Sequence, residues 1–121
     1  MDIQQMIWEI LRECGIPMYT GGSIYTADCI ITIISHEIEH KNEKLKICMV
    51  YESVAKFREV SFSTIVTTVR SALQKIDFNN EVSKKYFKEP GEKSAFYLFE
   101  FARTLREELD NEINNKNNSH E

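Results

Sequence analysis

Apolar residues recur at intervals of three and four along most of the chain, which is the spacing of one face of an α-helix. The first such stripe covers residues 3–14. Gly15 follows it as a candidate C-terminal cap, and Pro17 prevents the helix from continuing. The pattern therefore predicts an N-terminal amphipathic helix that stops at a sharp loop.

A second apolar stripe covers residues 27–38, and Ser23 offers an N-cap for it. The run 29–34 is dense in β-branched side chains, which also suits a buried strand. We favour a helix, because the stripe is longer than an ordinary strand.

Two further stripes follow one another closely. The first has its inner face on Ile47, Val50, Tyr51, Val54 and Phe57, and the second covers residues 65–76. Ser61 is a candidate N-cap for the second helix, and only residues 58–60 separate it from Phe57. Two helices joined by so short a turn predict a helix-turn-helix over about residues 45–76.

The rest of the chain predicts a short helix near residues 82–87 and a long last helix from Ser94. The last helix is apolar over a wide arc with several aromatic residues, so it is either deeply buried or part of an interface. We expect one all-α domain over residues 1–113, a compact bundle of five to six helices, followed by a disordered polar tail at 114–121. The aromatic last helix suggests possible self-association.

Length and composition favour a cytoplasmic protein. The N-terminal segment lacks the basic start of a signal peptide, and the run 29–34 is too short to cross a bilayer, so we expect no membrane contact. Cys14, Cys29 and Cys48 are an odd number without a C-x-x-C spacing, and we interpret them as reduced core residues. We expect no cofactor and no metal.

The net charge of −4 is unevenly distributed. Residues 44–76 carry six basic and two acidic side chains, a balance of +4, which leaves −8 for the rest of the chain. A basic segment on an acidic body is typical of a domain that meets phosphates with one face, although ordinary charge scatter can produce the same pattern.

The loop after the first predicted helix and the predicted helix-turn-helix together resemble one known family. The residues that carry the resemblance are Gly15-Ile16-Pro17, Gly22 and Tyr25, then Val50-Tyr51, Val54-Ala55-Lys56, Ser63, Ile65, Val69-Arg70 and Ala72-Leu73, and finally Leu105-Arg106. Together they look like the C-terminal effector domain of the sporulation response regulator family (stage-zero sporulation protein A). The resemblance implies an all-α fold, sequence-specific binding of double-stranded DNA, and transcription regulation through a second helix in the major groove.

The chain departs from the family where that second helix begins. The family has a Ser-Arg-Val-Glu-Arg pattern there, whereas residues 63–67 read Ser-Thr-Ile-Val-Thr. Arginine reads guanine through a two-pronged hydrogen bond that threonine cannot replace, although threonine can contact a thymine methyl group. We therefore expect either a different, thymine-rich site or weakened DNA binding, and Val66 adds a candidate apolar contact.

The candidate DNA contacts lie on or near the outer side of the predicted second helix, or carry a basic charge suited to phosphates. They are Lys56, Arg58, Ser61, Ser63, Thr64, Thr67, Arg70 and Ser71. The same residues would also suit a solvated helix face. The alternative function is a protein-interaction module of the same fold that has lost DNA binding and acts through its last helix.

A rival motif is His36-Glu37-Ile38-Glu39-His40, which matches the H-E-x-x-H pattern of zinc proteases. Zinc needs a third protein ligand, and the next histidine is His120 in the expected tail. Histidines at a helix C-terminus are also favourable without any metal, because they interact with the helix dipole. We therefore expect no enzyme, and keep a zinc metalloprotease as a minor alternative.

Overall fold

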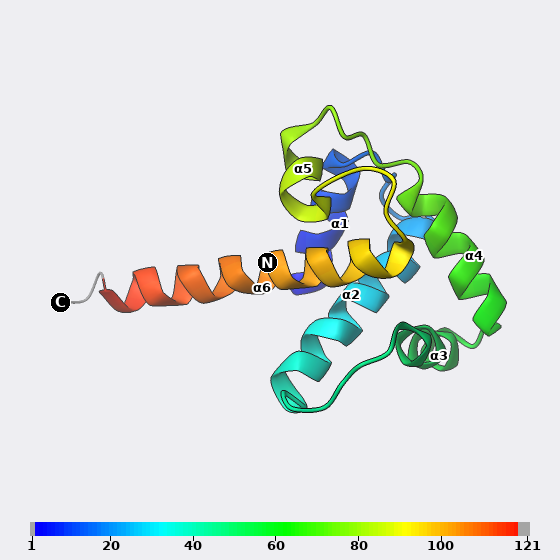
Figure 1. Ribbon diagram of the computed structural model, residues 1–121, viewed down its shortest axis with the longest axis horizontal. Helices are drawn as coiled ribbons and strands as arrows, with labels where there is room; N and C mark the ends of the chain where they lie inside the picture. The colour runs from blue at the N-terminus through cyan, green and yellow to red at the C-terminus, as the bar shows by residue number, and fades with distance from the viewer. Residues whose placement is uncertain (1, 119–121) are drawn as a thin grey trace.

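The helix α2 (Gly21–Glu39) is the element around which the other helices pack in the computed structural model, which describes residues 2–118 (Figure 1). The remaining helices are α1 (Ile3–Glu13), α3 (Ile47–Arg58), α4 (Phe62–Leu73), α5 (Glu81–Phe87) and α6 (Ser94–Asn118). The described part of the chain contains no strand, so the prediction of an all-α bundle is confirmed.

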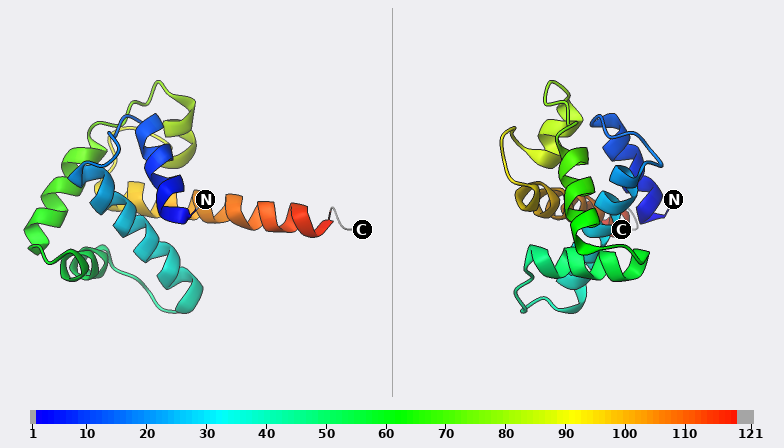
Figure 2. Two further views of the ribbon diagram at one scale, coloured as in Figure 1. Left: turned by 180° about the vertical axis from the view of Figure 1, so that it is seen from behind. Right: turned by 90° about the vertical axis from the view of Figure 1, so that its right-hand side faces the viewer.

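The helices form two groups on either side of α2 and α6. Figure 2 shows α1 and α5 together on one side, and α3 and α4 on the other. α2 contacts α1, α3, α4 and α6, and all six helices contribute to one hydrophobic core. Its β-branched run is therefore helical and largely buried, because partners on several sides cover a helix that is apolar over a wide arc.

The N-cap of α2 lies three residues before the expected one. Thr20 is the N-cap, and its hydroxyl oxygen accepts a hydrogen bond from the Ser23 N–H at 3.2 Å. Ser23 lies inside the helix and is fully buried, so the expectation that Ser23 caps α2 was wrong. Thr20 satisfies the same preference, since threonine and serine can both accept this bond.

The loop after α1 is fixed against the connector that follows α4. Gly15 has a φ of 110°, which a residue with a side chain rarely adopts. Just before it, the Asp77 N–H donates to the Cys14 carbonyl at 2.9 Å, and the Asn80 side-chain amide donates to the Glu13 carbonyl at 2.7 Å. The glycine therefore brings the end of α1 against a segment more than sixty residues away.

Two of the aromatic residues of α6 pack in the hydrophobic core. Tyr97 and Phe101 are buried, and both pack against Phe87 of α5 at ring-centroid distances of 5.7 and 5.3 Å. The sequence predicts that this helix is either deeply buried or part of an interface. Its first half is buried. Its second half extends beyond the bundle (Figure 1).

α6 also continues further than the sequence pattern predicts. The sequence predicts a disordered tail over residues 114–121, whereas the structure continues the helix through residues 114–118, and residues 119–121 lie outside the described part. Extending a helix costs little once its first turns are formed, because each added residue contributes a hydrogen bond. An anchored helix therefore does not need apolar side chains to continue.

Two of the three cysteines occupy the core as expected. Cys14 and Cys29 are buried, and burial raises the pKa of Cys14 to about 11 and that of Cys29 to about 12, which keeps both as neutral thiols. Cys48 is exposed, so the expectation of a core position was wrong for this residue. α3 buries only the face that carries Val50, Tyr51, Val54 and Ala55.

Candidate nucleic-acid interface

The turn between α3 and α4 has a defined hydrogen-bond pattern. Glu59 adopts the left-handed conformation, with φ 56° and ψ 45°. The Val60 N–H donates to the Ala55 carbonyl at 3.1 Å, and the Glu59 N–H donates to the Lys56 carbonyl at 3.3 Å. This is the Schellman pattern, which satisfies carbonyls at a helix end and reverses the chain within a few residues.

α4 starts as the sequence predicts. The Ser61 hydroxyl oxygen accepts a hydrogen bond from the Thr64 N–H at 3.1 Å, which confirms Ser61 as the N-cap. The Ser61 hydroxyl also lies 2.7 Å from the Thr64 hydroxyl and 3.2 Å from that of Ser63. Three hydroxyl groups therefore gather at the N-terminus of α4, where free N–H groups and the helix dipole favour an anion such as a phosphate.

The predicted contacts on α4 share one exposed face. Ile65, Val69, Ala72 and Leu73 are buried on the opposite side. The exposed residues that had been predicted are Ser63, Thr64, Thr67, Arg70 and Ser71. The structure thus brings together the polar candidate contacts that the sequence placed within α4, whereas Val66 is half-buried and packs against the core.

Arg58 is different from the other candidates because it already has a partner. Its guanidinium donates to both carboxylate oxygens of Asp28 on α2, at 2.6 and 3.0 Å. The Asp28 side chain is 9% exposed and that of Arg58 is 31% exposed. This two-pronged ion pair joins α3 to α2, so Arg58 is held in a structural contact and is not free to meet a phosphate without breaking it.

The ion pair leads to an asymmetric prediction for stability. Arg58→Met leaves the Asp28 carboxylate buried and unpaired, and should lower the free energy of unfolding by about 2–4 kcal/mol. Asp28→Asn should cost only about 1 kcal/mol, because the Arg58 side chain can turn toward water. Urea unfolding of both variants measures the difference, and equal losses would contradict the assigned contact.

Phe57 also departs from its expected place. It was assigned to the inner face of α3, but it is 73% exposed and lies against the Arg58 guanidinium, 4.9 Å from ring centroid to the central carbon. Val54 and Ala55 are the buried residues nearest that end of the helix. Lys56 is exposed beside it, as predicted for a phosphate contact.

Sequence reasoning missed three residues near this surface. Gln74 is exposed one helical turn beyond Ser71 and Arg70, and the three- and four-residue spacing could have identified it. Lys93 precedes α6 and approaches α4 only through the tertiary fold. Asp28 could have been noticed as an acidic residue inside an apolar stripe, which usually requires a buried partner.

The H-E-x-x-H segment lies at the end of α2, away from α4 (Figure 1). The rings of His36 and His40 are 5.3 Å apart, and His36 Nε2 lies 3.0 Å from the Glu43 carbonyl oxygen. The carboxylate of Glu37, which would be the general base of a zinc protease, is 3.3 Å from the Arg106 guanidinium. Within residues 2–118 no group of three or more His, Cys, Asp or Glu side chains is placed to hold a metal ion, and His120 lies outside this range.

Comparison with protein-family models, with curated proteins and with solved structures found no match for this chain. Among the helices described here, none is both long and apolar enough to cross a membrane.

Proposed function

We propose that the protein binds double-stranded DNA with the exposed face of α4 in the major groove. The observation that carries this proposal is the composition of that face, where Ser63, Thr64, Thr67 and Ser71 present small hydrogen-bonding side chains on a rigid helix. A helix of this size fits the major groove, and in a helix-turn-helix the preceding helix, here α3, crosses the DNA backbone.

The charges around α4 support contact with phosphates. Lys56, Arg70 and Lys75 are exposed, and none of them forms an ion pair with another described residue. Arg58 is neutralised by Asp28, so the basic balance of residues 44–76 is one charge weaker at this surface than the sequence alone indicates. We therefore expect DNA affinity that depends strongly on salt and is modest in strength.

The hydroxyl-rich face favours one kind of sequence preference. Threonine methyl groups pack against thymine methyl groups, and serine or threonine hydroxyls hydrogen-bond to several bases. Without an arginine at the start of α4, strong guanine reading is absent from residues 62–67. We propose a preference for thymine-rich duplexes, with smaller discrimination than arginine contacts would give.

The proposal agrees with the resemblance to the sporulation response regulator family, in which such a domain regulates transcription. Several residues behind that resemblance have structural roles here: Gly15 fixes the loop after α1, and Val54 and Val69 are buried. Because these residues act in folding, they support a similar fold and do not by themselves support a similar DNA site. Transcription regulation is part of the proposal.

Fluorescence anisotropy against short duplexes at low and moderate salt tests the proposal. We expect binding that weakens with salt and is tighter for thymine-rich duplexes. Thr67→Glu places a carboxylate at the centre of the exposed face, so it should weaken binding at least about tenfold without affecting folding. Absence of binding at low salt, or unchanged binding by Thr67→Glu, would refute the proposal.

Arg70→Ala should weaken DNA binding about three- to tenfold and reduce the salt slope by about one. The unfolding free energy should change by less than about 0.5 kcal/mol, because the side chain is exposed. Arg12→Ala is the matched control, since it removes an exposed arginine from α1. Similar effects of both variants on binding would indicate only a general charge effect.

A second candidate function is a protein-interaction module that acts through the end of α6. The observation that favours it is the projecting half of this helix, where Ile113 is 57% exposed (Figure 1). Light scattering over a wide concentration range tests self-association, which the aromatic residues of α6 suggested. A monomer at millimolar concentration, together with salt-dependent DNA binding, would leave DNA as the preferred partner.

A further inference from the structure

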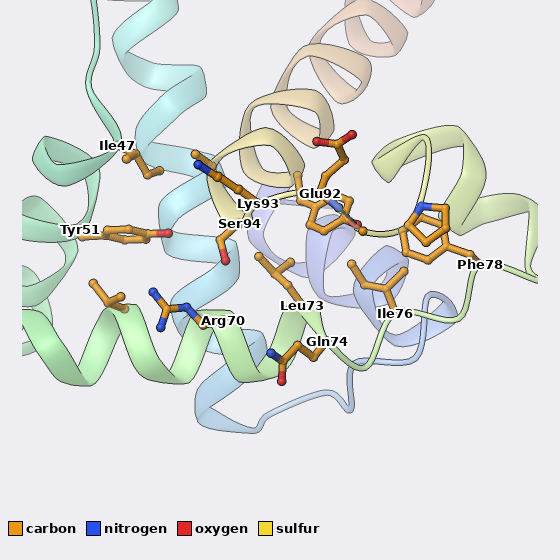
Figure 3. A pocket seen from close by; sticks show the side chains of 15 residues that line it. Ile47, Tyr51, Arg70, Leu73, Gln74, Ile76, Phe78, Glu92, Lys93 and Ser94 are labelled. Carbon is orange, nitrogen blue, oxygen red and sulfur yellow. Dashed lines mark hydrogen bonds between the residues drawn. The ribbon is translucent and has the colours of Figure 1, made fainter.

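A cavity of about 700 Å³ opens between α3, α4 and the start of α6 (Figure 3). This volume lies in the range of small-molecule binding sites. The side chains around it come from three segments that are separated in sequence: α3, α4 with the connector after it, and the loop before α6 with the first turn of α6. The cavity was not predictable from any single motif.

One end of the cavity is polar. Figure 3 shows the hydroxyl groups of Tyr51 and Ser94 and the guanidinium of Arg70 directed toward the same region. Tyr51 is only 7% exposed, and burial raises its pKa to about 12, so its hydroxyl stays protonated at neutral pH and can donate a hydrogen bond. Lys93 adds a second cation to the lining.

The charge of this end favours an anion. Neither Arg70 nor Lys93 forms an ion pair within residues 2–118. Glu92 is the one carboxylate of the lining, and Figure 3 shows it directed away from Arg70. The N-terminus of α6 at Ser94 adds the positive end of a long helix dipole.

The other end of the cavity is apolar. It is lined by Leu73 at the end of α4, by Ile76 and Phe78 of the connector, and by Tyr97 of α6. A ligand that fills both ends therefore needs an anionic head and an apolar body. A free phosphate or sulfate would leave the apolar end unfilled, and a neutral hydrocarbon would leave both cations unpaired.

We infer that this cavity binds a small amphipathic carboxylate, with its head between Tyr51, Arg70 and Lys93 and its apolar body against Leu73, Ile76 and Phe78. The carboxylate accepts hydrogen bonds from the Tyr51 hydroxyl and the Arg70 guanidinium, and Lys93 contributes charge at the mouth. The cavity shares Arg70 with the α4 face proposed to bind DNA, whereas Tyr51 and Lys93 belong to the cavity alone.

Titration of the isotope-labelled protein with decanoate, followed by nuclear magnetic resonance, tests the inference. We expect saturable shifts of the amide signals of Leu73, Ser94 and their neighbours. Decyltrimethylammonium has the same alkyl chain with a positive head, and should bind at least about tenfold more weakly. Absence of saturable shifts, or equal affinity for the two amphiphiles, would overturn the inference.

Two variants locate the head of the ligand. Lys93→Gln should weaken decanoate binding at least about threefold, and Tyr51→Phe, which removes only a hydroxyl, should do the same. Lys84→Gln on the exposed side of α5 is the matched control and should leave the affinity unchanged. If Lys93→Gln leaves the affinity for decanoate unchanged, the assignment of the ligand's head is wrong. This test holds even if Tyr51→Phe unfolds the protein.

Discussion

Phe101→Ala is expected to lower the free energy of unfolding by about 3–5 kcal/mol. The ring is completely buried on α6 and packs against the aromatic rings of Tyr86 and Phe87 in α5, with centroids 4.7 and 5.3 Å away. Removing it loses apolar burial and leaves a cavity that the surrounding helices fill only in part. Because domains of this size are stable by about 5–15 kcal/mol, the loss is a large share of the total.

Phe57→Ala is the matched control for this substitution. The chemical change is the same, but the Phe57 ring is 73% exposed, so the free energy of unfolding should change by less than about 1 kcal/mol. Urea unfolding followed by circular dichroism measures both variants. If the two substitutions cost the same, the placement of α6 against α5 is incorrect.

Gly15→Ala is expected to cost about 2–4 kcal/mol, from two separate causes. An alanine at the observed φ of 110° is strained, which accounts for about 1–2 kcal/mol. In addition, its Cβ would lie 2.7 Å from the carbonyl oxygen of Lys75, which is backbone and cannot easily move aside. The loop after α1 would then separate from the connector after α4.

Gly91→Ala separates the two causes. Gly91 also has a positive φ, of 85°, but a Cβ at this position would meet nothing within 4 Å. Its substitution should therefore cost only the backbone strain, about 1 kcal/mol. The difference between the two variants in urea unfolding reports the steric contact alone, and a difference near zero would show that Gly15 and Lys75 are not in contact.

Local chemistry was enough to predict most of the helices. The three- and four-residue spacing of apolar side chains located five of the six helices, because each of these buries a stripe of its surface, whereas the short helix near residues 82–87 was placed inside a polar connector. The α4 cap was equally readable, since Ser61 acts on its own helix through a bond to Thr64. The exposed face of α4 followed from the same periodicity, because the residues opposite a buried stripe must face outward.

The end of α3 was harder to predict, because the surroundings of its residues depend on other helices. Phe57 and Arg58 are neighbours on α3, yet the aromatic ring is exposed and the cation is held by Asp28, which is thirty positions earlier in the chain. Burial follows from which helix covers which face, and hydropathy alone does not contain this information. A buried carboxylate nearby makes the position favourable for arginine.

The sequence by itself determined the helical class, most helix positions and the polar face of α4, because these depend on contacts between residues three or four positions apart. The tertiary structure alone decided which charges are free. It pairs Arg58 with Asp28, brings Lys93 toward Arg70, and creates the cavity from α3, α4 and α6. Such features depend on how helices distant in sequence pack together, and many packings are compatible with the same local pattern.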